Sequence, residues 1–492
     1  MTVPAWPVAF VAGAAAVLGF SPFDQFLAVL AALAVLVQLL LAARTPRAAF
    51  AIGYLFGLGL FAAGVSWVYV SLHRFGAMPA PLAAFATLAF CAFLALFPGT
   101  AAWLQARLGA RVSPALRAAL AVPAAWVLLE WLRGWILTGF PWLSVGYAAI
   151  DDALGGYAPL GGVYAVSLAL GCAAGLLWCA IVGHARWPAL AALALLLAAG
   201  FGLRSAQWTT PAGEPLAVSL LQGNVPQEMK FDPARYARTL ETYASLAEAS
   251  TARLIVLPET AVPRFLDRVD PAYLERLRAA ARRNGGDLLL GIPVRVLNDR
   301  GESYYNSVVS LGVSPPQVYH KQHLVPFGEF VPPGFGWIVR VLSIPLSDFS
   351  RGGEGQRPLA VAGQRVALNI CYEDAYGREI ARQLPEATML VNVSNVAWFG
   401  DSLAPAQHLQ IARMRALESG RWHLTAANTG ITAAIAPDGS VRARMPQFLQ
   451  GRVDAQVRGH TGATPYVRLG DWPALALAVA ALAFVARRGR RQ

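Results

Sequence analysis

The stretch Val366-Ala367-Leu368-Asn369-Ile370-Cys371-Tyr372-Glu373-Asp374 is an apolar strand that runs directly into a cysteine followed by carboxylates. Such a strand end is where an α/β domain carries a nucleophilic side chain. A thiol is useful there only if one group removes its proton and another stabilises the oxyanion formed on the attacked carbonyl. The alternative is that Cys371 is a small buried hydrophobic residue, as most free cysteines are.

Two other segments end in side chains that suit this chemistry. They are Leu257-Pro258-Glu259-Thr260 and Tyr319-His320-Lys321-Gln322. Both follow extended runs, and side chains at strand ends in α/β sheets converge on one edge, where ligands bind. Taken alone, Glu259 could be a helix cap or a surface carboxylate, and Lys321 could belong to a solvated basic turn. Their shared context with Cys371 favours one catalytic site.

The histidines that flank Lys321 are the one hint of a metal site. His320 and His323 lie close together, but no nearby cysteine or carboxylate completes a set of ligands. Zinc sites in proteins use three or four protein ligands. We therefore expect neither a metal nor another cofactor.

The chain is too apolar for an average soluble protein, because 56% of its 492 residues are hydrophobic and only 14% are charged. Eight nearly uncharged segments have roughly the length that a bilayer requires. They cover residues 4–20, 25–43, 48–72, 80–106, 118–132, 163–183, 187–203 and 472–486. The first could instead be a signal peptide, but no basic residue precedes it. We expect a membrane domain of seven helices over residues 1–203, and a final helix with a basic tail over residues 469–492.

Arginines are shared unequally between the loops. With the N-terminus in the cytoplasm, the cytoplasmic side carries Arg44, Arg47, Arg107, Arg111, Arg117, Arg186, Arg487, Arg488, Arg490 and Arg491, and the other side only Arg74, Arg133 and Arg204. The positive-inside rule thus favours both termini inside and residues 204–468 outside. The net charge of +12 arises partly from these arginines, so it implies no nucleic-acid partner.

Residues 204–468 have the mixed composition of a globular α/β domain. Strands are expected over residues 216–221, 254–257, 288–293, 304–311, 366–370 and 389–393, and helices over residues 233–249, 271–283 and 405–418. Cys371 is the one cysteine of this domain, so it has no partner for an intradomain disulfide. An unpaired thiol in an oxidising compartment favours a reactive role.

These motifs resemble those of the nitrilase, or carbon-nitrogen hydrolase, superfamily. The resemblance rests on Pro258-Glu259-Thr260, Tyr319-His320-Lys321, Leu324-Val325-Pro326-Phe327-Gly328-Glu329 and Cys371-Tyr372-Glu373. It implies an α-β-β-α sandwich and a Glu-Lys-Cys triad. Glu259 would be the general base, Lys321 would stabilise the oxyanion and Cys371 would be the nucleophile.

Further motifs resemble the apolipoprotein N-acyltransferases of Gram-negative bacteria, a membrane-embedded branch of that superfamily. They are Leu221-Gln222-Gly223-Asn224-Val225-Pro226-Gln227, Arg133-Gly134-Trp135, Thr138-Gly139-Phe140-Pro141-Trp142 and Val393-Ser394-Asn395-Val396-Ala397-Trp398-Phe399-Gly400. One departure is Phe231, where family members commonly have Trp. The resemblance implies transfer of an acyl chain from a membrane phospholipid, through a Cys371 thioester, to the α-amino group of a diacylglyceryl-cysteine on an apolipoprotein. It also implies the inner membrane, with the catalytic domain in the periplasm.

The resemblance assigns supporting roles as well. Glu329 and Glu373 would orient Lys321 and Glu259, and Tyr372 would support the nucleophile. Because a carboxylate is a weak base for a thiol, we expect a partly desolvated site to bring the pKa values of Glu259 and Cys371 closer. The residues that would line a lipid entrance are Trp135, Phe140, Trp142, Phe231 and Trp398. For Trp135, Phe140 and Trp142, the alternative is that these aromatic side chains only anchor the chain at the membrane surface.

Two other classes of protein fit parts of the sequence. The superfamily motifs alone would permit a membrane-tethered amidase or nitrilase acting on a small C–N substrate. A transporter with an external domain fits less well, because the predicted spans lack the embedded charges that transport pathways usually carry.

Overall fold

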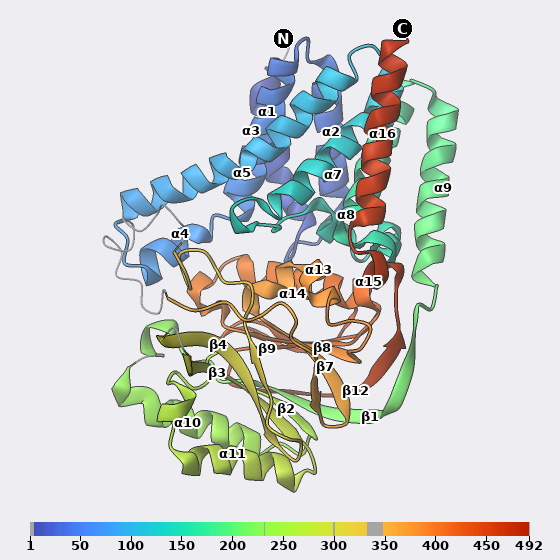
Figure 1. Ribbon diagram of the computed structural model, residues 1–492. Coiled ribbons are helices and arrows are strands. Elements are labelled where there is room, and N and C mark those ends of the chain that lie inside the picture. Colours follow the sequence, from blue (N-terminus) through green and yellow to red (C-terminus); the bar gives the residue numbers. More distant parts are fainter. Residues whose placement is uncertain (1–3, 231, 299–300, 332–347, 492) are drawn as a thin grey trace. The chain divides into compact units, whose positions relative to one another are not determined.

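The computed structural model describes residues 4–230, 232–298, 301–331 and 348–491, and the chain divides into two compact units (Figure 1). The helical unit comprises Met1–Tyr69, Ala80–Gln207 and Thr464–Gln492. The α/β unit comprises Trp208–Ala463 together with Val70–Pro79, a short segment from between two long helices.

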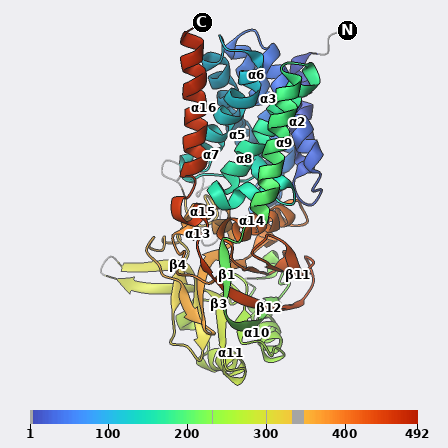
Figure 2. The same cartoon turned by 90° about the vertical axis from the view of Figure 1, so that its right-hand side faces the viewer.

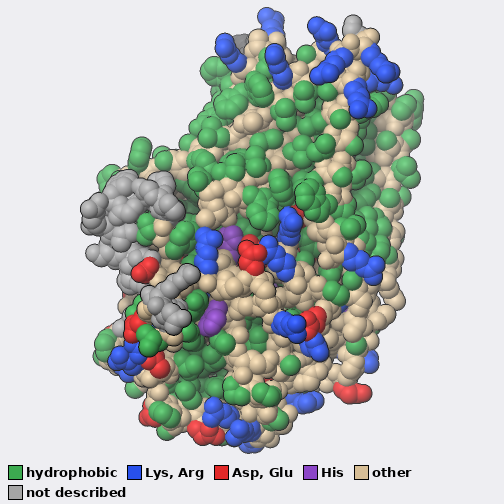
Figure 3. All heavy atoms as spheres, viewed as in Figure 1, with side chains coloured by type: hydrophobic (Ala, Val, Ile, Leu, Met, Phe, Trp, Pro, Cys, Tyr) green, Lys and Arg blue, Asp and Glu red, His purple; other side chains and the backbone are tan. Residues whose placement is uncertain are grey.

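All eight predicted spans are helical. The longer helices are α1 (Ala5–Ala16), α2 (Phe26–Ala42), α3 (Pro46–Gly64), α5 (Ala80–Leu108), α7 (Val122–Arg133), α8 (Ala158–Val182), α9 (Arg186–Arg204) and α16 (Trp472–Arg490), and the shorter ones are α4 (Val68–Val70), α6 (Pro114–Leu116) and α15 (Pro465–Leu469). Six helical stretches in the described residues are long and apolar enough to cross a membrane, and Ala5–Gly19 and Phe26–Ala42 are shorter apolar helices. Basic side chains gather at the end of this unit where both termini lie (Figure 3).

The third span ends earlier than predicted. Helix α3 stops at Gly64, whereas the apolar run suggested residue 72. The backbone leaves the helix at Val65, and the indole of Trp67 donates a hydrogen bond to the carbonyl of Gly64, 3.1 Å away. An apolar run shows that a segment is buried, but here the end of the helix is set by its cap.

Glycines allow close approach between helices of this unit. A Cβ on Gly13 of α1 would lie 1.9 Å from the carbonyl oxygen of Phe56, and a Cβ on Gly59 of α3 would lie 2.1 Å from that of Phe10. Small residues at such crossings are the usual means of packing helices in a lipid environment.

The α/β unit has two six-stranded sheets. The first has the order β12-β1-β2-β3-β4-β5, and the second has the order β11-β10-β9-β8-β7-β6. The strands of the first sheet are β1 (Thr209–Gln222), β2 (Leu254–Val256), β3 (Asp287–Asn298), β4 (Gly301–Gly312), β5 (Val318–His320) and β12 (Gly451–Gly462). Those of the second are β6 (Leu359–Val361), β7 (Gln364–Ile370), β8 (Met389–Ser394), β9 (His423–Ala427), β10 (Thr432–Ile435) and β11 (Val441–Met445).

The two sheets pack face to face with helices outside them. Alternate residues of β7, such as Val366 and Leu368, join Val218 of β1 and Val256 of β2 in one core between the sheets. The opposite face of the first sheet packs on α10 (Pro233–Glu248) and α11 (Pro271–Arg283). On the outer side of the second sheet lie α13 (Gly377–Ala381) and α14 (Ala404–Ser419) (Figures 1 and 2). The predicted α-β-β-α sandwich is confirmed, and every strand and helix expected in this unit is present.

Candidate active site

Strand ends carry the three predicted catalytic side chains. Glu259 lies three residues beyond the end of β2, Lys321 directly follows β5, and Cys371 directly follows β7. β2 is parallel to β3, and β5 is the antiparallel neighbour of β4 in the same sheet. The second sheet supplies Cys371 from β7, which is parallel to β8.

The Glu259 carboxylate is 7% exposed and is held by donors from three elements. Its Oε1 accepts a hydrogen bond from Asn306 Nδ2 at 2.7 Å and lies 3.5 Å from Lys321 Nζ. Its Oε2 accepts from the backbone N–H of Asn395 at 2.8 Å. These contacts use lone pairs on both oxygens and fix the plane of the carboxylate.

The Lys321 ammonium is buried between two carboxylates. Besides Glu259, it contacts Glu329, with Nζ and Oε1 2.9 Å apart. Asn306 Nδ2 also donates to Glu329, at 2.8 Å. Burial alone would lower the pKa of Lys321, but the charges of Glu329 and Glu259 outweigh it and raise this pKa. Lys321 is therefore a fixed cation. Glu329, which the family resemblance gave as a residue that orients Lys321, is in contact with its ammonium.

Cys371 has a left-handed backbone, with φ of +54°. This conformation costs a non-glycine residue roughly 1–2 kcal/mol, and it persists only where neighbours enforce it. The Cys371 carbonyl accepts a hydrogen bond from Asn392 Nδ2 at 3.2 Å. It also lies 3.1 Å from His408 Nε2, which donates to it in the tautomer that carries a proton on Nε2. A sharp turn at the end of β7 thus presents the thiol.

The site separates the pKa values of Glu259 and Cys371. Burial would raise the pKa of Glu259, but the positive charges of Lys321 and Lys230 and the hydrogen bonds from Asn306 and Asn395 lower it overall. Burial, followed by the negative charge of Glu259, raises the pKa of the Cys371 thiol to about 12. The expected convergence of the two values was wrong, because the buried cations stabilise the carboxylate more than they stabilise a thiolate.

Glu373 joins the ends of β5 and β7. Its carboxylate accepts hydrogen bonds from the backbone N–H groups of Gln322 (2.8 Å), His323 (3.0 Å) and Ile370 (2.6 Å). The Tyr319 hydroxyl lies 3.1 Å from Oε2 of the same group. Burial raises the pKa of Glu373 to about 7. Glu373 therefore connects the turn that carries Lys321 to the turn that carries Cys371.

Tyr372 packs beside this connection. Its ring lies 5.8 Å from that of His323 and 5.3 Å from that of Tyr376, centroid to centroid, both edge to face. The aromatic cluster covers the turn after Cys371.

The predicted lipid-entrance residues fall into different surroundings. Trp142 is buried in the helical unit, 5.4 Å from the ring of Trp67, and Phe140 stacks on it at 6.2 Å. Trp135 is 38% exposed. In the α/β unit Trp398 is half-buried, and Phe231 lies outside the described residues.

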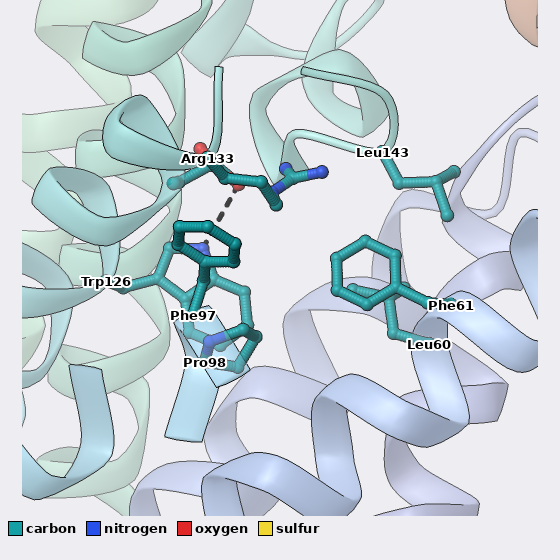
Figure 4. Close-up of a pocket in the computed structure, with 8 residues that line it drawn as sticks. Leu60, Phe61, Phe97, Pro98, Trp126, Arg133 and Leu143 are labelled. Carbon is teal, nitrogen blue, oxygen red and sulfur yellow. Dashed lines mark hydrogen bonds between the residues drawn. The ribbon is translucent and has the colours of Figure 1, made fainter. Parts of the chain in front are cut away.

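The helical unit contains a small cavity, whose lining includes Phe97, Pro98 and Leu143 (Figure 4). Trp126 and Arg133 of α7 border it on one side, and Leu60 and Phe61 of α3 border it on the other. Arg133 Nη1 donates to the carbonyls of Phe140, at 2.9 Å, and of Trp142. Its charge is therefore directed at the loop after α7.

Glu130, one helical turn before Arg133, contacts the same loop. Its Oε1 accepts hydrogen bonds from the N–H of Val145 at 2.9 Å and from the indole of Trp126 at 3.2 Å. The buried side chains of Glu130 and Arg133 thus fix the loop that contains Phe140 and Trp142.

Sequence reasoning did not single out Asn306, Lys230, Asn392 or His408 as parts of the site. Asn306 is one of several polar residues in the predicted strand over residues 304–311, and only sheet pairing brings it to Glu259. Lys230 stands between Met229 and Phe231, and this apolar context for a charged residue was the available signal.

Two packed six-stranded sheets, with Glu259, Lys321 and Cys371 beyond strand ends, define an α/β domain of the carbon-nitrogen hydrolase class. The model of the family described as Carbon-nitrogen hydrolase matches residues 217–466, and that of the Apolipoprotein N-acyltransferase N-terminal domain matches residues 12–176. The chain belongs to the apolipoprotein N-acyltransferase family, and it is a membrane-associated acyltransferase.

Curated relatives match over nearly the whole chain. The apolipoprotein N-acyltransferase of Nitrosomonas europaea is 49% identical over 98% of this chain and 98% of its own length. That of Chromobacterium violaceum is 46% identical over 94% of this chain and 90% of its own. That of Ralstonia nicotianae is 46% identical over 99% and 94%, respectively.

Proposed function

We propose that this enzyme transfers an acyl chain from a membrane phospholipid to the α-amino group of the N-terminal diacylglyceryl-cysteine of apolipoproteins, through a thioester on Cys371. The observation that carries the proposal is the convergence of Glu259, Lys321 and Cys371 in a chain whose family acylates, by name, apolipoproteins. No metal or other cofactor takes part in this chemistry.

In the first step Cys371 Sγ attacks the ester carbonyl carbon of the phospholipid while Glu259 accepts the thiol proton. Because the thiol binds its proton more tightly than the carboxylate does, proton transfer and formation of the S–C bond occur together. The negative charge that develops on the carbonyl oxygen is stabilised by the Lys321 ammonium and by the backbone N–H of Tyr372. The C–O bond then breaks, and Glu259 returns the proton to the departing lysophospholipid oxygen.

In the second step the amine of the apolipoprotein attacks the thioester carbonyl. Glu259 accepts a proton from the amine, the C–S bond breaks, and the proton returns to Cys371 Sγ. The amide product is a triacylated lipoprotein, and the thiol is regenerated. Glu329 keeps Lys321 in place during both steps, and Glu373 with Tyr372 maintains the turn at the nucleophile.

The membrane helices fit substrates that cannot leave the bilayer. Exposing an acyl chain to water costs about 0.8 kcal/mol per CH₂ group, so a thiol close to the lipid surface avoids a large penalty. We place the enzyme in the bacterial inner membrane, with residues 204–468 as the periplasmic catalytic domain, residues 1–203 and 469–492 as the membrane part, and both termini in the cytoplasm. The basic side chains at the end of the helical unit that carries the termini support this orientation. Trp135, Phe140, Trp142, Phe231 and Trp398 are proposed to border the path of the lipid.

Acyl-enzyme formation tests the proposal directly. Purified enzyme incubated with a phospholipid labelled in its acyl chain should form a hydroxylamine-sensitive adduct on Cys371. Cys371→Ala should lack it, and Glu259→Gln and Lys321→Met should form it at least 100-fold more slowly, since one oxyanion donor contributes on the order of 3 kcal/mol.

Cys179→Ala is the matched control, because Cys179 is a buried thiol in α8 and should leave the adduct unchanged. An adduct on the Cys371→Ala variant would refute the assignment of the nucleophile. Release of ammonia from small amides, with no adduct from phospholipid, would instead favour a membrane-tethered amidase.

A further inference from the structure

Lys230 is a buried cation that the two steps above do not use. It is 4% exposed, and its Nζ donates a hydrogen bond to the backbone carbonyl of Glu259 at 3.1 Å. This is the one hydrogen bond of its ammonium within the described part of the chain, although an ammonium can donate three. Burying an ammonium group with a single hydrogen bond costs free energy, so a role for its charge would explain why a lysine stands there.

The amino-acid composition singles out the same residue. Of the 40 basic residues of the chain, only Lys230 and Lys321 are lysines, and all the others are arginines. Both lysines contact Glu259, one at its backbone carbonyl and the other at its carboxylate. A chain that uses arginine at every other basic position has a compact ammonium at these two. The wide, planar guanidinium of arginine is a different donor in both shape and hydration.

The loop that carries Lys230 is attached to the site by amide side chains. Asn428 Oδ1 accepts from the N–H of Val225 at 2.9 Å, and Asn428 Nδ2 donates to the carbonyl of Val225 at 2.8 Å. Asn395 Nδ2 donates to Gln227 Oε1 at 2.9 Å, while the N–H of Asn395 binds the Glu259 carboxylate. Lys230 therefore approaches Glu259 on a fixed backbone.

The positive charge of Lys230 offsets the negative charge of buried carboxylates. Two carboxylates and two ammonium groups are linked at Glu259: Lys321 lies between Glu259 and Glu329, and Lys230 contacts Glu259. Glu373, also buried near the thiol, is held instead by backbone N–H groups. The groups whose charge acts on Lys230 are Glu259, from the loop after β2, and Cys371, from the end of β7. Without Lys230, two carboxylates would share one cation, and Glu259 would bind a proton more readily.

We propose that Lys230 is a positioning residue for acyl transfer, which holds Glu259 ionised and its backbone in place, so that Glu259 can accept a proton first from the thiol and later from the amine. This inference rests on the proposed function. Lys230 acts through Glu259 and touches neither substrate.

The presence of only two lysines permits a test that does not depend on activity. Enzyme labelled with ¹³C at the lysine side chains should give two ε-carbon signals, which Lys230→Met assigns. Burial lowers the pKa of Lys230 to about 8, and the negative charge of Glu259 opposes this shift. The Lys230 signal should therefore titrate near pH 8, and in Glu259→Gln it should titrate at lower pH. The Lys321 signal should not titrate below pH 10.

The kinetic arm measures the rate of acyl-enzyme formation with saturating labelled phospholipid. Lys230→Met should reduce this rate at least 30-fold while the half-saturating phospholipid concentration changes less than threefold. Asn284→Leu is the matched control, because Asn284 Nδ2 likewise donates to backbone carbonyls, those of Ser250 and Ala252, next to the start of β2. Acyl-enzyme formation in Asn284→Leu should stay within threefold of the wild-type rate, even if its melting temperature falls as much as that of Lys230→Met.

The possible outcomes separate the two hypotheses. Absence of an adduct in the wild-type enzyme would refute the proposed function, whatever the lysine signals show. If the wild-type enzyme forms the adduct, two results would overturn the role of Lys230 alone. One is an unchanged rate in Lys230→Met, and the other is a Lys230 titration that Glu259→Gln does not shift. An equal loss of rate in Lys230→Met and Asn284→Leu would reduce Lys230 to a structural residue.

Discussion

Cys371 and Glu259 influence each other's ionisation. The carboxylate is stabilised as an anion by Lys321, Lys230, Asn306 and the N–H of Asn395, and its negative charge in turn keeps the nearby thiol protonated. A free cysteine has a pKa of about 8.5 and is partly ionised at neutral pH. The half-buried thiol of Cys371 is thereby held in its protonated form, which is the less reactive one.

Alkylation of Cys371 tests whether the thiol is held in its protonated form. Iodoacetamide should modify Cys371 slowly at pH 7, and the rate should rise about tenfold per pH unit to beyond pH 10, since only the thiolate reacts. Glu259→Gln should raise the rate at pH 8 by about tenfold, because it removes the negative charge that raises the thiol pKa. Mass spectrometry of the peptide that contains Cys371 gives both rates.

A surface carboxylate provides the control. Glu354→Gln removes an exposed partner of Arg382 and should leave the alkylation rate unchanged. Equal rates for Glu259→Gln and wild type at pH 8 would show that another group keeps the thiol protonated.

At the scale of elements, β3 determines where Glu259 lies. Gly291 is paired with Val308 of β4, and its carbonyl accepts a hydrogen bond from the N–H of Ala261 at 2.9 Å. A Cβ on Gly291 would lie 2.2 Å from the carbonyl oxygen of Pro258 and 2.8 Å from Cα of Glu259. The turn that carries Glu259 therefore lies directly against the backbone of the neighbouring strand.

We expect Gly291→Ala to displace the Pro258–Glu259 backbone and to slow acyl-enzyme formation at least tenfold. Overpacking of this kind costs typically 1–3 kcal/mol, so the melting temperature should also fall. Gly353→Ala is the control, because a Cβ there would meet no atom within 4 Å and the residue does not have a positive φ. A Gly291→Ala enzyme with the wild-type rate would mean that the turn can shift without moving the carboxylate.

The elements also show what the sequence could reveal. Runs such as Leu288–Ile292 and Met389–Val393 predicted their strands, because strands buried on both faces are nearly continuously apolar. Strand β10, with the sequence Thr432-Ala433-Ala434-Ile435, lacks such a run, and β12 carries charges along much of its length; neither was predicted.

Some residues of the site could likewise be predicted from the sequence, and others could not. Glu259, Lys321 and Cys371 could be predicted from the ends of their strands. Asn306 and Lys230 could not, because their proximity to Glu259 depends on the pairing of β3 with β4 and on the course of the loop after β1. The pKa values could not be predicted either, since the balance between burial and neighbouring charge requires the positions of all the charged groups.

For the whole molecule, the central question is on which side of the membrane each part of the chain lies. Eight apolar helices place both termini on one side if each of them crosses, and the chain between α9 and α16 then lies on the other side. Arginines near the ends of α2, α5 and α16 favour the cytoplasm for the termini. The proposed reaction requires this arrangement, because the thiol must meet phospholipid at the outer surface of the inner membrane.

Labelling of single introduced cysteines in bacterial spheroplasts tests this topology. In a Cys371→Ala background, Gly353→Cys introduces a thiol in an exposed loop of the α/β unit, and Arg490→Cys introduces one at the exposed end of α16. A membrane-impermeant maleimide should label Gly353→Cys in intact spheroplasts and Arg490→Cys only after permeabilisation. Three native cysteines remain in this background: Cys91 and Cys179 are buried within helices and Cys172 is half-buried, so the Cys371→Ala chain without an introduced cysteine gives the background signal. Labelling of both variants in intact spheroplasts would mean that α16 does not cross the membrane, and the reverse pattern would put the thiol in the cytoplasm, where the proposed substrates could not reach it.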